Sequence, residues 1–168
     1  KKISKKQIKE DEFFSKTKLE DLLDEILNSF RETSSKEIVL VSKDNKNSFD
    51  LQRTPELIYG LRNFIGNAVK FSKSRVEIIL MSDEQTIQIK INDDGPGFPE
   101  DIIDMIGEPY IKSKSNQVSS NSGTGLGTFL GKTLLERQSA NLNFTNDIKL
   151  KGASVIVEWN IKNLISNS

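Results

Sequence analysis

Two alternating apolar runs, joined by a short polar turn, constrain the fold of this chain more than any other feature. Residues 75–81 and 86–92 place valine, isoleucine or leucine at every second position, and residues 82–85 between them are polar. Successive side chains of a strand point to opposite faces, so this pattern predicts a β-hairpin with one buried face. The second predicted strand runs directly into a loop at residues 93–98, which therefore lies at a strand end.

This loop consists of two aspartates followed by glycine, proline, glycine and phenylalanine. Glycines at alternate positions let the backbone bend tightly and come close to a flat or charged ligand, and a neighbouring carboxylate accepts hydrogen bonds. Aspartate, glycine and proline also make up ordinary turns. The loop by itself is therefore consistent with either a ligand-binding loop or a plain turn.

The remaining apolar positions divide the chain into helices and further strands. Recurrence at three and four residues predicts helices, whereas alternation and β-branched runs predict strands. Thr17 is the expected N-cap of the first helix, and the second helix is expected to start at Thr54 with Pro55 at a first-turn position. The expected helices span residues 17–30, 54–72, 100–106 and 128–138, and the further strands span residues 38–41, 141–146 and 153–159.

The second helix carries a polar row beside its apolar stripe. Asn63 and Asn67 stand four residues apart on one face, and Lys70 follows one turn later. Asparagine is a poor helix former, so two in register suggest a selected site, although an ordinary solvated stripe fits the same pattern. The apolar stripe is expected to be buried and comprises Leu57, Ile58, Leu61, Phe64, Ile65, Ala68, Val69 and Phe71.

A second glycine-rich string follows a long polar stretch. Residues 112–122 contain a single apolar side chain, and a loop of this length inside a compact domain is often a lid. Residues 123–127 then supply three glycines that open a predicted helix. Free backbone N–H groups at a helix start can bind phosphate. A linker or an ordinary helix start would produce the same bare pattern.

Composition restricts the available chemistry. The chain contains no cysteine and no histidine, which excludes disulfides, thiol nucleophiles, the commonest general base and the usual zinc ligands. The 24 basic residues balance 24 acidic ones, so charge gives no argument for a nucleic-acid partner. No apolar run approaches the roughly 20 residues that a membrane helix needs, so a cytoplasmic location is expected.

The length of 168 residues favours a single domain. We expect residues 17–160 to form this domain, residues 1–16 to be a linker remnant from an upstream domain, and residues 161–168 to be a loose tail. The first residue is Lys1 rather than methionine, which suggests a fragment of a longer protein.

Taken in order, these elements resemble the ATP-binding catalytic domain of sensor histidine kinases, within the superfamily that also holds the ATPase domains of gyrase, Hsp90 and MutL. Residues 63–71 match its N box, residues 93–98 its first glycine box and residues 123–127 its second. Residues 57–61, 106–110, 132–137 and 152–159 are similar to the RegB/PrrB/ActS type. The resemblance implies an α/β (α+β) two-layer sandwich of the Bergerat type, with a mixed, mostly antiparallel sheet packed on helices.

The resemblance also implies roles for individual residues. Asp93 would bind the adenine amino group, and Asn67 would ligate the Mg²⁺ that bridges the phosphates of ATP. Lys70 would contact the phosphates as a point charge. The remaining expected contacts are Gly95 and Gly97 beside the base, Phe71 and Tyr110 at the pocket border, and Gly123, Thr124, Gly125, Leu126, Gly127 and Lys114 at the phosphates.

The implied reaction is transfer of the γ-phosphoryl group of ATP to a histidine, which depends mainly on positioning and charge neutralisation. Asn63 stands where hydrolases of the superfamily carry a water-activating acid, so slow ATP hydrolysis is expected. Gly66 stands where many relatives carry glutamate, which leaves the general base unassigned. Asp94 is expected to be an ordinary loop residue.

Because the chain has no histidine, the acceptor must lie elsewhere. The implied partners are a dimerisation and phosphoacceptor domain of the same protein and a response regulator, with the full-length protein a membrane-anchored homodimer.

Three alternatives remain. A serine kinase of the anti-sigma-factor type, or a stand-alone ATPase, is disfavoured by Asn63 and by residues 107–110. A nucleotide-binding module without catalysis is kept open by Gly66. A purely structural α/β domain is disfavoured by two glycine strings and a polar stretch in this order.

Overall fold

A mixed sheet of five strands forms one layer of the domain, with the strand order β2-β4-β5-β7-β6. The structure is a computed structural model that describes residues 16–43, 50–101, 103–106 and 126–166. In chain order its elements are β1 (Lys16–Lys18), α2 (Leu19–Arg31), β2 (Glu37–Lys43), β3 (Asp50–Gln52), α3 (Pro55–Phe71), β4 (Arg75–Ser82), β5 (Thr86–Asp93), the 3-10 helix η1 (Ile103–Met105), α4 (Leu126–Arg137), β6 (Asn141–Asn146), β7 (Ala153–Asn160) and α5 (Ile161–Ser166).

β2 runs parallel to β4, and the other neighbouring strands of this sheet are antiparallel. The register aligns the buried residues in rows across the sheet: Leu80 lies opposite Ile89, and Ile89 lies opposite Val157. Trp159 is fully buried near the end of β7, opposite Ile87. The alternation of the strands therefore gives the sheet one continuous apolar face.

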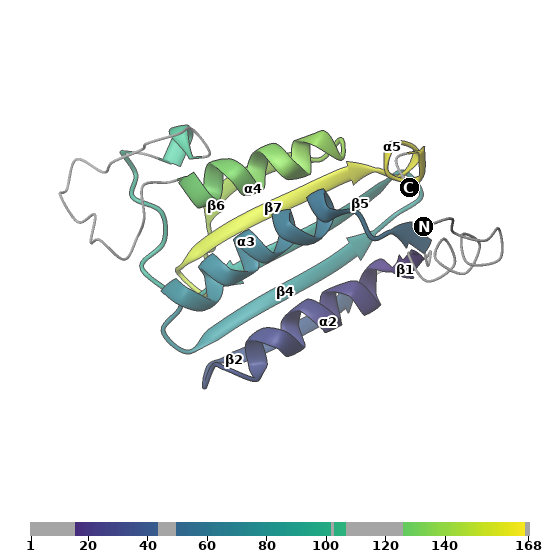
Figure 1. Cartoon of the computed structure of the whole chain (residues 1–168). Coiled ribbons are helices and arrows are strands. Elements are labelled where there is room, and N and C mark those ends of the chain that lie inside the picture. Colours follow the sequence, from purple (N-terminus) through teal and green to yellow (C-terminus); the bar gives the residue numbers. More distant parts are fainter. Residues whose placement is uncertain (1–15, 44–49, 102, 107–125, 167–168) are drawn as a thin grey trace, which may run out of the picture.

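α2, α3 and α4 lie side by side across one face of the sheet (Figure 1). α3 begins as its sequence predicts, because the hydroxyl of Thr54 accepts a hydrogen bond from the amide of Leu57 at 3.2 Å and Pro55 occupies the first turn. Leu61 and Ile65, one turn apart on α3, are fully buried in the shared core. No helix in the described part of the chain is long and apolar enough to span a bilayer.

The predicted fold class is confirmed, since the sheet is mixed, mostly antiparallel and packed on helices. The predicted hairpin is β4 and β5, and the helix expected at residues 54–72 is α3. The strands expected at residues 38–41, 141–146 and 153–159 are β2, β6 and β7, and α4 includes most of the helix expected at residues 128–138.

The start of the domain differs from the sequence expectation. Thr17 does not cap the first helix, because it lies in β1, which pairs with β3. The helix begins at Leu19, and Lys18 at its N-cap makes no side-chain capping bond. Lys16 is thus part of a strand rather than a linker. β3 itself was not predicted, because three residues are too few to establish an alternation.

Three further expectations differ from the structure. Phe71, expected to be buried, is 38% exposed, because it is the last residue of α3. Residues 161–166 are not a loose tail but form α5, whose Leu164 is 4% exposed and belongs to the core. The helix expected at residues 100–106 is reduced to η1, with residue 102 outside the described residues.

Candidate functional site

Asp93 is the last residue of β5 and only 4% exposed. Its Oδ1 accepts hydrogen bonds from the amide of Gly95 at 2.8 Å and from the amide of Ala153 at 3.3 Å. Burial raises the pKa of the Asp93 carboxyl, and these two amide bonds partly oppose that shift. The structure therefore holds one buried carboxylate in a fixed orientation at the end of the central hairpin.

Glycine is required on two sides of this carboxylate. A methyl group at Gly95 would overlap the carbonyl oxygen of Phe71, and one at Gly152 would overlap the carbonyl oxygen of Asp93. These clashes are with backbone atoms, which cannot move aside as the end of a flexible side chain can. The loop, the end of α3 and the start of β7 are thus packed backbone to backbone around Asp93.

The exit of the loop is held by a residue that the sequence analysis did not identify. Asn146, at the end of β6, accepts a hydrogen bond from the amide of Phe98 at 2.7 Å and donates one to the carbonyl of Phe98 at 3.1 Å. Gly97 has a φ of +78°, and a Cβ there would lie 2.7 Å from Oδ1 of Asn146. The Phe98 ring packs edge-on against Phe144, with centroids 6.0 Å apart.

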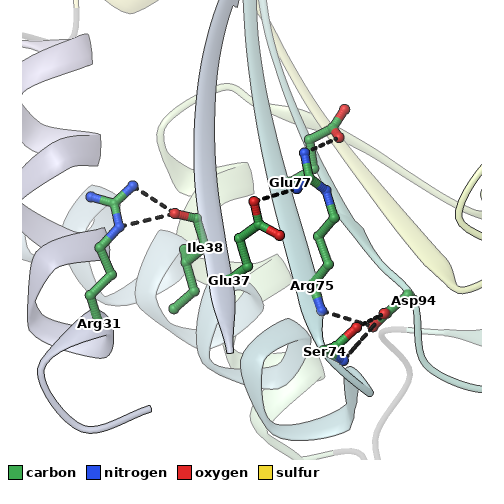
Figure 2. A network of polar contacts seen from close by, with 7 residues as sticks. All are labelled: Arg31, Glu37, Ile38, Ser74, Arg75, Glu77 and Asp94. Carbon is green, nitrogen blue, oxygen red and sulfur yellow. Dashed lines mark hydrogen bonds and ion pairs between the residues drawn. The ribbon is translucent and has the colours of Figure 1, made fainter. Parts of the chain in front are cut away.

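Asp94 binds the connection between α3 and β4 (Figure 2). Its Oδ1 accepts from the amides of Lys73 at 2.8 Å, Ser74 at 3.1 Å and Arg75 at 3.2 Å. Its Oδ2 accepts from the hydroxyl of Ser74 at 2.8 Å. Partial burial acts to raise the pKa of Asp94, but the hydrogen bonds from Ser74, Arg75 and Lys73 outweigh it and lower that pKa to about 2. Asp94 thus makes long-range hydrogen bonds, which the expectation of an ordinary loop residue did not specify.

The polar row of α3 faces the start of α4. Asn67 Nδ2 lies 3.4 Å from the Thr128 hydroxyl oxygen, in the first turn of α4. Asn63 donates to the carbonyl of Tyr59 at 2.9 Å, and its Oδ1 would lie 3.5 Å from a Cβ at Gly127. Both asparagines are half-buried. The structure thus brings the N box residues together with the beginning of the helix that the second glycine string opens.

Lys70 lies at the exposed end of this row, with its Nζ 5.2 Å from the centroid of the Phe71 ring. Lys36 holds the last turn of α3, and its role was not predicted from the sequence. The Lys36 ammonium donates to the carbonyl oxygens of Val69 and Lys70. A lysine at these carbonyls complements the negative end of the helix dipole. Its positive charge also acts to lower the pKa of Asp93.

Five of the predicted contact residues lie outside the described residues: Tyr110, Lys114, Gly123, Thr124 and Gly125. Leu126 and Gly127 form the first residues of α4. Within the described ranges, no group of three or more histidine, cysteine, aspartate or glutamate side chains could hold a metal ion.

Comparisons with known proteins identify the family of this chain. Residues 53–163 match the family described as Histidine kinase-, DNA gyrase B-, and HSP90-like ATPase. The sensor histidine kinase RegB of Cereibacter sphaeroides is 41% identical over 128 residues, which cover 67% of this chain and 28% of RegB. The histidine protein kinase SaeS of Staphylococcus aureus is 31% identical over 105 residues, covering 60% of this chain and 30% of SaeS. The chain thus spans less than a third of the length of these relatives.

Solved structures share the fold. The mycobacterial sensor histidine kinase MprB superposes with a TM-score of 0.72 at 20% identity, over 86% of this chain and 97% of that one. ShkA, solved in complex with AMPPNP, superposes with a TM-score of 0.69 at 21% identity, over 84% of this chain and 30% of that one. With the family match, the chain belongs to the histidine kinase-, DNA gyrase B- and HSP90-like ATPase family, and it is an ATP-binding domain of the kind found in sensor histidine kinases such as RegB.

Proposed function

We propose that the domain binds Mg-ATP between the end of β5, the polar row of α3 and the start of α4, and transfers the γ-phosphoryl group to a histidine on a separate domain. The observation that carries the proposal is the joint placement of Asp93 and Asn67. One is a buried carboxylate beside two obligatory glycines, and the other is an amide facing Thr128 at a helix start. Asp93 would accept a hydrogen bond from the base, and Asn67 would lie at the phosphates.

Asp93 is the proposed adenine contact. A carboxylate only accepts hydrogen bonds, so it selects a base that presents an amino group at that point. The amides of Gly95 and Ala153 already occupy part of Oδ1, which fixes the carboxylate plane. Gly95 and Gly97 would let the base lie close to the loop backbone. Phe71, exposed at the end of α3, is available as a border of the pocket, and Tyr110 is proposed for the same role.

Asn67 and Lys70 are the proposed contacts at the phosphate end. Mg²⁺ usually keeps several waters and binds one or two protein oxygens together with phosphates, so a single amide oxygen fits its donor set. When bound, Mg²⁺ would neutralise phosphate charge. Lys70 would add a point charge. The backbone amides of residues 123–127 and the side chain of Lys114 are proposed to complete the phosphate site.

Asn63 bears on the reaction that follows binding. An amide cannot accept a proton from water as a carboxylate does, so ATP hydrolysis by this domain should be slow. The acceptor histidine, the general base and the transfer to a response regulator are then assigned to other parts of the full-length protein and its partner. We propose that this protein is a homodimer, anchored in a membrane, with the present domain on the cytoplasmic side.

A second candidate function is nucleotide binding without phosphoryl transfer. Gly66 favours it, because the glutamate of many relatives is missing at this position and the general base is unassigned. The position is half-buried, and a Cβ there would lie 3.4 Å from the Phe30 ring of α2. The glutamate that many relatives carry would have to share that space with Phe30.

The deciding experiment mixes this domain with a separate fragment that carries the acceptor histidine, together with ATP labelled on its γ-phosphate. We expect label on the histidine fragment, and its loss with Asn67→Ala. Tight ATP binding without any transfer would favour the binding module. Absence of ATP binding in calorimetry with Mg²⁺ would exclude both functions.

A further inference from the structure

Asp94 connects two segments that are distant in the sequence. It lies in the loop after β5, and its partners Lys73, Ser74 and Arg75 form the junction between α3 and β4, 19 to 21 residues earlier. The connection is reciprocal, because the amide of Asp94 donates to the carbonyl of Arg75 at 3.3 Å. The carboxylate therefore fastens the end of α3 to the loop that contains Asp93.

We infer that Asp94 is a positioning residue for ATP binding: it fixes the distance between Asp93 at the adenine end and Lys70 at the phosphate end of the proposed site. This inference rests on the proposed function. Asp93 precedes Asp94 directly, and Lys70 lies one residue before the end of α3. A ligand that contacts both ends gains affinity only if the two ends are held at the separation that it spans.

Two other contacts hold the end of α3, and neither is a directional bond between α3 and the loop. Gly95 lies against the carbonyl of Phe71, and Lys36 holds the last turn of α3 from the side of α2. Neither contact fixes the junction at residues 72–74 against the loop. Charge-assisted hydrogen bonds from several donors to one carboxylate do so with defined geometry.

Asp83 provides a matched control at the opposite end of the same hairpin. Its carboxylate accepts from the amides of Gln85 and Thr86, each at 2.7 Å, and from the Thr86 hydroxyl at 3.3 Å. The chemistry is the same, but every one of these partners lies within three residues. Loss of the Asp83 carboxylate removes these bonds within a local turn, whereas loss of the Asp94 carboxylate loosens the α3 end from the loop.

The test compares Asp94→Asn with Asp83→Asn for binding of Mg-ATP and of adenosine. In Asp94→Asn the new NH₂ group faces amide donors, so the junction contacts are weakened. We expect ATP binding to weaken about tenfold in Asp94→Asn and less than twofold in Asp83→Asn. Adenosine reaches only the Asp93 end, so its affinity should change less than about twofold in both variants.

Equal weakening of ATP and adenosine in Asp94→Asn would mean that Asp94 acts only on its neighbour Asp93, and would overturn the inference. So would ATP binding by Asp94→Asn that matches Asp83→Asn. If the unchanged protein binds no ATP, the proposed function fails first and the inference fails with it. Ser74→Ala removes only the hydroxyl contact of 2.8 Å, and it covers the case in which Asp94→Asn does not fold. It should weaken ATP binding about two- to threefold, again with adenosine unchanged, and unchanged ATP binding would count against the inference.

Discussion

Asn146 holds Phe98 by both backbone groups, accepting from its amide at 2.7 Å and donating to its carbonyl at 3.1 Å. The Asn146 amide thus makes the two hydrogen bonds to Phe98 that the backbone of a paired strand would make. The contact begins where the chain leaves the Asp93 loop, and it depends on the positive φ of Gly97.

The first prediction concerns this clamp. Asn146→Ala should lower the free energy of unfolding by about 1–2 kcal/mol, because two hydrogen bonds are lost and the Phe98 backbone groups must find water instead. It should also raise the amide exchange rate at Phe98, measured by hydrogen exchange. Asn143→Ala, at an exposed position of the same strand, is the control. Equal exchange at Phe98 in both variants would contradict the prediction.

The second prediction concerns base selection by Asp93. Asp93→Asn should weaken ATP binding about tenfold or more, because the neutral amide presents a donor where the carboxylate accepts. Binding of GTP, which lacks the matching amino group, should change much less. Titration calorimetry with both nucleotides measures the difference, and an equal loss for ATP and GTP would count against the assigned role.

The third prediction concerns pH. The pKa of Asp94 is about 2, below its ordinary value of 3.8, so the folded state is stabilised above the unfolded pKa and loses this stabilisation as the pH falls through the folded pKa. The stability difference between the native protein and Asp94→Asn should therefore be about 1–2 kcal/mol near pH 6, after allowance for solvent screening. It should shrink between about pH 4 and pH 2.

Urea unfolding at several pH values measures this difference. The raised pKa of Asp93 makes its contribution to stability change with pH in the opposite direction, since burial favours the protonated form. This contribution is present in both proteins and largely cancels from the difference. A difference that stayed constant down to pH 2 would show that these hydrogen bonds do not stabilise the charged form of the Asp94 carboxyl in the folded protein.

The fourth prediction concerns close packing at Gly95. Gly95→Ala should destabilise the domain by about 2 kcal/mol or more, because the methyl group overlaps the Phe71 carbonyl and one backbone segment must move. It should also weaken ATP binding. Thermal unfolding and calorimetry are the measurements, and an unchanged midpoint would mean that the loop moves aside without cost.

The fifth prediction has the opposite sign. Gly66→Ala should stabilise the domain by about 0.5–1 kcal/mol, because alanine is the better helix former and its Cβ would meet Phe30 at an ordinary 3.4 Å. Unfolding in urea would measure the gain. A loss of stability would show that the Phe30 ring cannot accommodate even a methyl group, which would further exclude a glutamate there.

The regular elements could be predicted because their signals are local. The apolar repeat of α3 and the alternation of β4 and β5 each extend over many residues, and Thr54 with Pro55 marks a helix start. β1 and β3 have three residues each and depend on one another. α5 could not be predicted either, because its short span acquires a core position only where Leu164 meets the folded sheet.

The site was predicted where a motif carries it and missed where distant residues do. Asp93, Asn67 and Lys70 belong to recognisable strings, and their roles remain proposals. Lys36 and Asn146 act on the backbone of segments far along the chain, which no local pattern records. Asp93 and Asp94 are adjacent and chemically identical in sequence, yet only the fold decides that one is buried and the other binds a helix end.

The burial of Trp159 gives the protein an intrinsic optical probe. It is the single tryptophan of the chain and is fully shielded from water, so its fluorescence should be blue-shifted in the native state and move to longer wavelength on unfolding. It pairs with Ile87, at the opposite end of β5 from Asp93. Its emission can therefore follow global unfolding of each variant, free of direct quenching by a nucleotide bound at the other end of the sheet.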